Sequence, residues 1–161
     1  MWYNKYMEDI TFTGYQPEFN AELNTWQTKE NMAGSNGLNQ FVVTEGTMLG
    51  DYLEFVDSEM PDITTRLAFD QENLVGFLCY STPEENHTHI EIMGVNPDCR
   101  GKGYSPRMLD SFKKSLQETS QDPQNLTLSV NKANLAGIAS FSKVARIAEK
   151  QDKENYIHFE L

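Results

Sequence analysis

A chain of 161 residues is long enough for one domain, and its 39% hydrophobic and 23% charged residues are typical of a folded globular protein. A net charge of −11 disfavours nucleic acid and anionic membranes as partners and favours cationic small molecules or basic peptides, although the same acidity would also serve solubility alone. Two cysteines give neither a disulfide framework nor a zinc spacing, and no signal peptide or long apolar run is present, so we expect a cytoplasmic protein without a transmembrane segment.

Apolar periodicity divides the chain into strands and helices. Period-two or continuous apolar runs predict strands, and apolar residues three and four apart predict helices. In chain order the expected elements are a strand over 8–15, helices over 18–32 and from Thr44 to about residue 60, strands over 66–70, 74–80 and 87–95, a helix over 106–118, a strand over 126–130, a helix over 136–144 and a strand over 156–161.

The segment between the strand over 87–95 and the helix over 106–118 is the most informative part of the sequence. It reads NPDCRGKGYS over residues 96–105. Its two glycines leave backbone N–H groups unshielded, its Arg and Lys add positive charge, and the next helix turn adds unpaired N–H groups and the positive end of a dipole. Pro106 fits that first turn, where a missing N–H costs least. We therefore expect a diphosphate site here.

Two common phosphate loops do not match this segment. A Walker A loop ends in Gly-Lys-Ser or Gly-Lys-Thr, and a dinucleotide fingerprint needs a glycine where Pro106 stands. Gly-Lys-Gly by itself would fit a surface turn, but the flanking strand and helix favour a binding loop. Residues 100–105 resemble motif A of the GNAT acyltransferases, Q/R-x-x-G-x-G/A, with Ser105 at the last small position, and residues 95–97 are similar to that family's strand end.

The resemblance implies a fold and a division of the chain. The order of the expected elements is similar to the GNAT domain over most of the chain, most strongly over 62–144. This implies one α+β domain over 1–161 of the layered α/β/α type, with a mixed, mostly antiparallel central sheet flanked by helices and splayed at the central strand. Within it, residues 1–61 would supply acceptor-side helices, 62–144 the acyl-CoA-binding core and 145–161 the C-terminal strands.

Three titratable side chains alternate along the strand over 87–95. The strand period places His87, His89 and Glu91 on one face, with Ile90 and Ile92 on the other. In GNAT enzymes the general base, or the residues that hold a relaying water, often lie here, which implies Glu91 as the catalytic base and His89 as a second catalytic residue. Two alternatives stay open: the histidines are merely solvated, or His-x-His-x-Glu binds a metal, which the family does not need.

The resemblance also implies how acetyl-CoA is bound. Backbone groups from Met93 to Val95 would hold the pantetheine arm, on a strand with a bulge near Gly94, and polarise the thioester carbonyl. Asn134 would hold the pantetheine or a nearby turn. Phe141 stands where a tyrosine often protonates the leaving thiolate, which phenylalanine cannot do. The expected cofactor-binding residues are Met93, Val95, Arg100, Gly101, Lys102, Gly103, Tyr104, Ser105, Asn134 and Phe141.

The implied activity is N-acetyltransferase, moving an acetyl group from acetyl-CoA directly to a primary amine of a small molecule or peptide, with no metal. The acidity of the chain favours a cationic acceptor. Departures from the family pattern at Phe141 and at Ala145-Arg146, where Gly-Phe is usual, leave open a non-catalytic CoA-binding or regulatory module. A homodimer is also open, since GNAT domains are often dimers but no residue here requires one.

Overall fold

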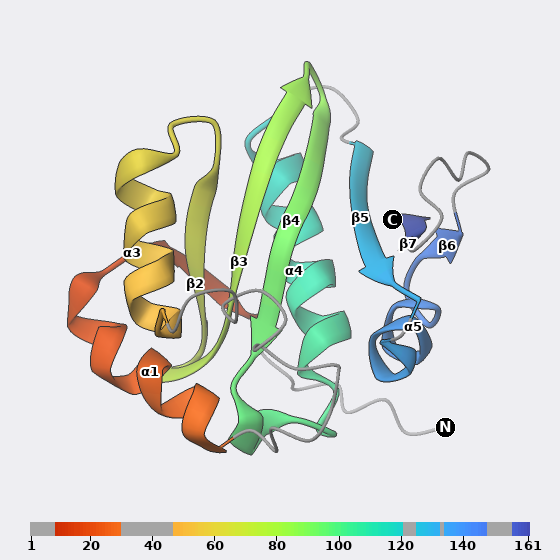
Figure 1. The fold of residues 1–161 in the computed structure, drawn as a ribbon. Coiled ribbons are helices and arrows are strands. Elements are labelled where there is room, and N and C mark those ends of the chain that lie inside the picture. Colours follow the sequence, from red (N-terminus) through yellow and green to blue (C-terminus); the bar gives the residue numbers. More distant parts are fainter. Residues whose placement is uncertain (1–8, 30–46, 121–124, 133, 148–155) are drawn as a thin grey trace.

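The computed structural model describes residues 9–29, 47–120, 125–132, 134–147 and 156–161. In these ranges one sheet has the strand order β1-β2-β3-β4-β5-β7-β6 (Figure 1). Its strands are β1 (Thr11–Gly14), β2 (Thr64–Asp70), β3 (Asn73–Glu84), β4 (His87–Val95), β5 (Asn125–Asn131), β6 (Arg146–Ile147) and β7 (Tyr156–Glu160). Neighbours in this sheet are antiparallel except β4 and β5, which are parallel. The expected mixed, mostly antiparallel sheet is therefore confirmed.

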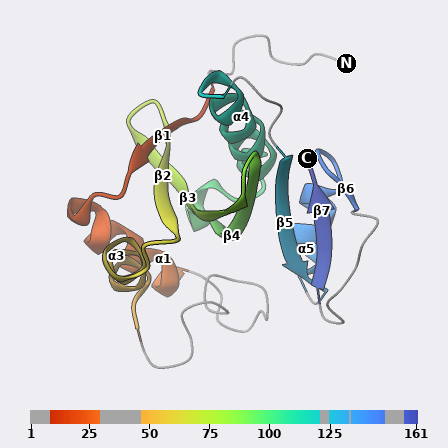
Figure 2. The ribbon, with the colours of Figure 1, turned by 90° about the horizontal axis from the view of Figure 1, so that it is seen from above.

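Helices cover both faces of the sheet. They are α1 (Asn20–Lys29), α3 (Leu49–Glu59), α4 (Tyr104–Glu118) and α5 (Leu135–Phe141), and short 3-10 helices lie at Pro17–Phe19 and Pro97–Cys99. Figure 2 shows α1 and α3 on one side of the sheet and α4 on the other. The connection from β4 to the parallel strand β5 runs through α4, as a parallel pair requires.

Separate apolar clusters fill the two sides. Between α1, α3 and the sheet, Trp26 is fully buried against Phe77, with ring centroids 6.4 Å apart. On the other side, Phe112 of α4 packs against Tyr80 of β3 at 5.1 Å. Helix α4 buries one apolar stripe and keeps its charged residues outside, which explains its helical spacing in the sequence. The core therefore fixes α4, and with it the loop that precedes α4.

A β-bulge interrupts the central strand at Glu91. Cys79 pairs with Ile92 and Tyr80 pairs with Ile90, so Glu91 is the extra residue. Ile90 consequently packs in the cluster on the α4 side, whereas Ile92 packs on the α1 and α3 side. The expectation that both isoleucines share one face is wrong, because an extra residue reverses the alternation. The bulge expected near Gly94 is also misplaced, since Gly94 pairs regularly with Phe77.

Some element boundaries differ from those expected. Helix α3 begins at Leu49 after Met48, which makes no side-chain cap, and the expected start at Thr44 lies outside the described residues. Helix α4 begins at Tyr104 rather than at Pro106, because Gly103 already takes the left-handed conformation that ends the loop. Strand β3 continues beyond Tyr80 to Glu84, past an irregular register with β4. Each difference is local and leaves the order of elements as expected.

Candidate functional site

The loop before α4 has the backbone that its glycines predict. Gly101 and Gly103 have φ values of 72° and 79°, in the left-handed region that favours glycine. A Cβ atom at either position would meet nothing within 4 Å, and both residues are exposed. The glycines therefore serve the path of the backbone and leave open space above it.

The N–H groups of this loop point to an anion site. Among the described residues, no turn, loop or cap hydrogen bond of the backbone is donated by the N–H groups from Gly101 to Ser105. Gly103 caps α4 without a side-chain hydrogen bond, and the first turn of α4 carries no acidic residue. A helix N-terminus with free donors attracts negative charge. The arrangement is of the kind that binds a diphosphate.

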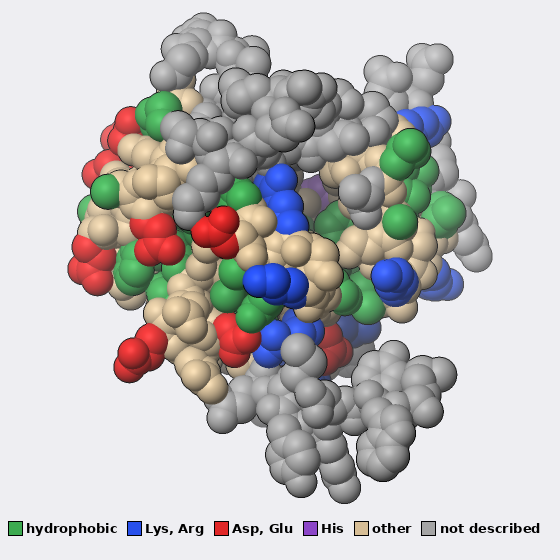
Figure 3. Space-filling model, turned by 90° about the horizontal axis from the view of Figure 1, so that it is seen from below, with side chains coloured by type: hydrophobic (Ala, Val, Ile, Leu, Met, Phe, Trp, Pro, Cys, Tyr) green, Lys and Arg blue, Asp and Glu red, His purple; other side chains and the backbone are tan. Residues whose placement is uncertain are grey.

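Basic side chains surround the same loop. Arg100 and Lys102 are exposed, and the Lys102 Nζ atom lies 3.0 Å from the carbonyl oxygen of Asp98, to which it donates. Figure 3 shows basic side chains gathered around the loop and the start of α4, beside a hollow with a histidine at its bottom. Acidic side chains gather toward α1 and α3 in the same view. Basic side chains therefore border the loop, although one acidic residue, Asp98, is also exposed within it.

Asn96 holds the other end of the loop. It is 9% exposed, its Oδ1 atom accepts from the N–H of Asp98 at 3.0 Å, and its Nδ2 atom donates to the carbonyl oxygen of Leu74 at 3.2 Å. Its own N–H donates to the carbonyl oxygen of Val75 at 2.8 Å. These bonds attach the exit of β4 to β3 and fix where the loop begins.

Strands β4 and β5 separate halfway along β4. Their parallel register runs from His87 with Asn125 to Ile90 with Leu128 and then ends, while β4 continues to Val95. The two ribbons diverge below this point (Figure 1). Beyond Ile90, β5 pairs with β7 and β4 pairs with β3. The backbone edge from Glu91 to Val95 that faces β5 is therefore unpaired within the described chain, and the expected splay at the central strand is present.

Glu91 lies where the strands separate. It is exposed on the bulge, and its Oε1 atom accepts a hydrogen bond from the Ser81 hydroxyl at 2.5 Å. Cys79, on the α1 and α3 side of the sheet, has its pKa raised to about 11, first by burial and also by the charge of Glu91. Glu91 thus lies on the side of the sheet opposite α4, close to the unpaired strand edge.

The two histidines of β4 share one hydroxyl group. His87 Nε2 and His89 Nδ1 both lie 2.8 Å from the Oγ1 atom of Thr127 on β5. A hydroxyl has a single hydrogen, so it donates to at most one of the two rings, and the other ring must donate to it if both bonds form. Thr127 therefore couples the tautomers of the two rings. Both rings are half-buried, and both bond to β5.

A third histidine lies on the same side of β5. His158 of β7 bonds through Nδ1 to the Ser129 hydroxyl at 2.7 Å, and Ser129 follows Thr127 by two residues on β5. In the described ranges, no three His, Cys, Asp or Glu side chains form a group that could hold a metal ion. The structure therefore offers no candidate metal group at residues 87–91.

Helix α5 places the remaining expected residues. The Asn134 Oδ1 atom caps α5 by accepting from the N–H of Gly137 at 2.9 Å. A Cβ atom on Gly137 would lie 2.6 Å from the Asn134 Nδ2 atom, so an alanine there would require the Asn134 side chain to shift. Phe141 packs against Phe159 of β7, with ring centroids 6.2 Å apart. Asn134 therefore supports a turn, and Phe141 supplies apolar packing with no proton to donate.

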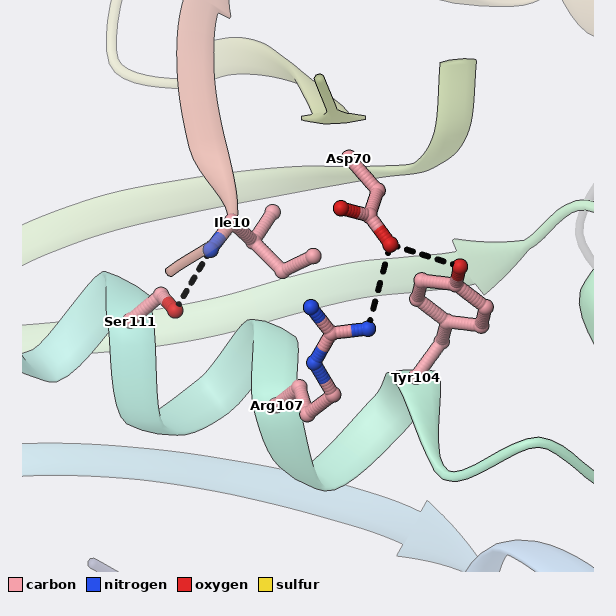
Figure 4. A network of polar contacts seen from close by, with 5 residues as sticks. All are labelled: Ile10, Asp70, Tyr104, Arg107 and Ser111. Carbon is pink, nitrogen blue, oxygen red and sulfur yellow. Dashed lines mark hydrogen bonds and ion pairs between the residues drawn. The ribbon is translucent and has the colours of Figure 1, made fainter. Parts of the chain in front are cut away.

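Tyr104 points away from the open side of the loop. Its hydroxyl donates to the Oδ2 atom of Asp70 at 2.7 Å, and the Nη1 atom of Arg107 donates to the same oxygen at 3.2 Å (Figure 4). The Arg107 guanidinium also lies over the Tyr104 ring, 4.9 Å from its centroid. The side chain of Tyr104 is thus held by β2, while its backbone N–H stays at the start of α4.

Three residues of this region escaped prediction from the sequence. Ser81, Thr127 and Asp70 each bond to an expected site residue that is 10 to 38 positions away in the chain. Thr127 belongs to an expected strand, and Ser81 lies one residue beyond the expected strand over 74–80, but a single sequence does not give the register that brings them to His89 and Glu91. For Asp70, the only signal was its place at the end of a strand beside a turn.

Comparison with known proteins agrees with this geometry. Residues 15–145 match the family model for the acetyltransferase (GNAT) family. A search of curated protein sequences finds no significant match. No helix in the described ranges is long and apolar enough to cross a membrane.

Three solved structures illustrate the likeness in fold. An acetyltransferase from Thermus thermophilus has a TM-score of 0.66 at 15% identity, over 96% of this chain and 97% of the other. The PaiA N-acetyltransferase from Thermoplasma acidophilum, solved with coenzyme A, has a TM-score of 0.65 at 16% identity, over 95% and 98%. A dodecameric spermidine N-acetyltransferase from Vibrio cholerae has a TM-score of 0.62 at 11% identity, over 95% and 93%. At such identities these likenesses concern the fold alone. The family model, in contrast, covers most of the chain. This protein therefore belongs to the GNAT acetyltransferase family.

Proposed function

We propose that this protein is an N-acetyltransferase that moves an acetyl group from acetyl-CoA to a primary amine of a small molecule or peptide. The observation that carries the proposal is the open loop at residues 101–105, whose unpaired N–H groups lie at the end of a strand that has separated from its parallel neighbour. Membership of the GNAT family supports the same donor. In this proposal the loop amides, with Arg100 and Lys102, hold the diphosphate.

The unpaired edge of β4 would hold the rest of the donor. Met93 and Val95 lie on the part of β4 that pairs only with β3 among the described strands, so their backbone groups on the other side can bond to an extended arm. An N–H in this stretch would polarise the thioester carbonyl and stabilise the oxyanion that forms when the amine attacks. Asn134 would contribute through the turn that it caps, and Phe141 through packing.

Glu91 is the proposed general base. An ammonium group must lose a proton before its nitrogen attacks the carbonyl carbon, and a carboxylate within direct or one-water reach can take that proton. The bulge sets Glu91 apart from the regular ladder, and the Ser81 hydroxyl holds one of its oxygens. His89, held by Thr127, is the second proposed catalytic residue. After attack, the C–S bond breaks and the sulfur leaves as a thiolate, which does not require a proton donor as an alkoxide would.

A cationic acceptor fits the charge distribution. Helix α3 carries Asp51, Glu54 and Asp57, which together with burial raise the pKa of Tyr15 to about 12. Burial is the larger cause, and the three carboxylates add to it. A negative potential of this kind attracts a protonated amine toward α1 and α3, the part of the chain proposed to meet the acceptor.

A second candidate is a CoA-binding module without catalysis. It is favoured by Phe141, which cannot protonate a thiolate, and by Arg146, which is taken up in an ion pair with Glu160 at 2.7 Å. One experiment separates the two candidates. Release of free thiol from acetyl-CoA is measured with a panel of amines, beside the shift in melting temperature caused by CoA. Thiol release that depends on an amine supports the enzyme. A CoA-dependent shift in melting temperature without thiol release supports the module. The absence of both signals refutes both candidates.

A further inference from the structure

Asp70 lies at the end of β2, but its carboxylate bonds to the first turn of α4. One oxygen, Oδ2, accepts from both the Tyr104 hydroxyl and the Arg107 guanidinium, at 2.7 and 3.2 Å (Figure 4). The Arg107 and Asp70 side chains are 17% and 23% exposed, so this ion pair is partly shielded from water. A charged hydrogen bond in such a place is stronger than one at the open surface.

The position of Tyr104 gives this contact its importance. Tyr104 is the first residue of α4 and follows Gly103 directly, and Arg107 is one turn further along the same helix. Two bonds from one carboxylate to residues three apart fix how the first turn is rotated about the helix axis. The direction of that turn's unpaired N–H groups is fixed with it.

Other contacts also hold parts of this region: the Lys102 Nζ atom donates to the Asp98 carbonyl oxygen, and the N–H of Arg107 donates to the Gly103 carbonyl oxygen. The space around the Cβ positions of Gly101 and Gly103 is open. Asn96 fixes the entrance of the loop to β3, and the exit needs an attachment of its own. The bonds from Asp70 attach the exit to β2, in addition to the core packing of α4.

We propose that Asp70 is a positioning residue for the donor: through Tyr104 and Arg107 it aims the N–H groups of residues 101–105 at the diphosphate. The proposal rests on the function proposed above and adds a residue outside the binding loop. In this proposal Asp70 acts through these two residues and does not touch the donor. Its carboxylate accepts a hydrogen bond from the Arg107 guanidinium, which holds that side chain toward β2.

The test compares two acetyl donors. Acetyl-CoA carries the diphosphate, and S-acetylpantetheine ends before it. For Asp70→Ala and Tyr104→Phe we expect the KM for acetyl-CoA to rise roughly tenfold with kcat unchanged, because hydrogen bonds to a charged group that fix the amides are lost. With S-acetylpantetheine, kcat/KM should stay at the wild-type value. Tyr104→Phe keeps the ring beneath Arg107 and removes only the hydroxyl, so it remains informative if Asp70→Ala folds poorly.

A control variant lies on the same helix. Asp110 of α4 pairs with Lys114 at 3.2 Å, and both side chains are more than half exposed. Asp110→Asn removes an acid from α4 without touching its first turn, and it should leave both donors unaffected.

Calorimetry with CoA and with pantetheine gives a second readout that needs no turnover. Two results would overturn the positioning role alone: equal losses of affinity for CoA and for pantetheine, or wild-type affinity for CoA in both variants. If the wild-type protein does not bind CoA at all, the proposed function fails first and the positioning role with it.

Discussion

Replacing Gly103 with alanine should separate binding from folding. Gly103 has a φ of 79°, and a Cβ atom there would meet nothing within 4 Å. Alanine in the left-handed region costs roughly 1–2 kcal/mol, and no steric clash with the protein adds to this. We therefore expect the free energy of unfolding of Gly103→Ala to fall by about 1–2 kcal/mol.

Binding should suffer more than this. The open space above Gly103 is where a diphosphate would approach the loop N–H groups, and a methyl group there blocks part of that approach. Losing hydrogen bonds to a charged group costs about 1.5–3 kcal/mol, which corresponds to roughly 10- to 100-fold weaker binding of CoA. Gly103→Asn sharpens the comparison, because asparagine tolerates the left-handed region but brings a larger side chain. It should lose affinity with less loss of stability.

Gly50→Ala is the matched control. Its Cβ atom would lie 2.6 Å from the Asn20 carbonyl oxygen and 2.7 Å from the Asn24 Oδ1 atom, where α3 packs against α1. Overpacking of this kind typically costs about 1–3 kcal/mol. Urea unfolding measures stability, and titration calorimetry measures affinity for CoA at a temperature where every variant is folded. The reasoning is refuted if Gly103→Ala binds CoA as tightly as the wild type, or if Gly50→Ala loses as much affinity as Gly103→Ala.

The same geometry makes three further predictions. Glu91→Gln should lower kcat by about 10²- to 10⁴-fold, the usual contribution of a general base, with little change in KM for acetyl-CoA. Steady-state kinetics with a fixed amine check this, and unchanged turnover would remove Glu91 from the mechanism. Hydrogen bonds from Tyr104, and then from Arg107, lower the pKa of Asp70, so the stability that its charge contributes is present above the unfolded pKa of about 3.9 and is lost as the pH falls through the folded pKa. The difference in melting temperature between wild type and Asp70→Asn should accordingly be full at pH 7 and shrink below about pH 4, and a difference that grows in acid would contradict the ion pair. Burial raises the pKa of the Cys79 thiol to about 11. A thiol reagent at about pH 8 should therefore modify Cys99 in the native protein and reach Cys79 only after unfolding. Peptide mass spectrometry checks this, and modification of Cys79 in the native protein would show that the core described here is wrong.

Much of the fold is local in origin, which is why the sequence predicts it. The central strand has the bounds 87–95 in both sequence and structure, because an apolar run there ends at a proline and begins after polar turn residues. The two glycines of the loop take positive φ values, as their spacing before a helix indicates. The start of α4 differs by two residues, because the left-handed Gly103, rather than Pro106, sets the boundary.

What the sequence could not predict depends on pairing between distant strands. The bulge at Glu91 arises from the register with β3, and strict alternation therefore failed for Ile90 and Ile92. The bond of Thr127 to His89 needs the parallel register of β4 with β5, which spans 38 positions in the chain. Asp70 reaches Tyr104 across 34 positions for the same reason. The roles of Glu91 and His89, and the division of the chain at residues 61 and 144, remain predictions.

The most direct measurement is the response of backbone amides to the donor. Two-dimensional NMR of the labelled protein follows each N–H group as acetyl-CoA is added, and S-acetylpantetheine serves as the comparison. The largest shifts with acetyl-CoA should fall on residues 101–105, toward lower field as their N–H groups gain charged acceptors, and S-acetylpantetheine should leave these amides nearly unchanged while shifting those near Val95. Amides of residues 101–105 that stay in place while acetyl-CoA saturates the protein would contradict the account.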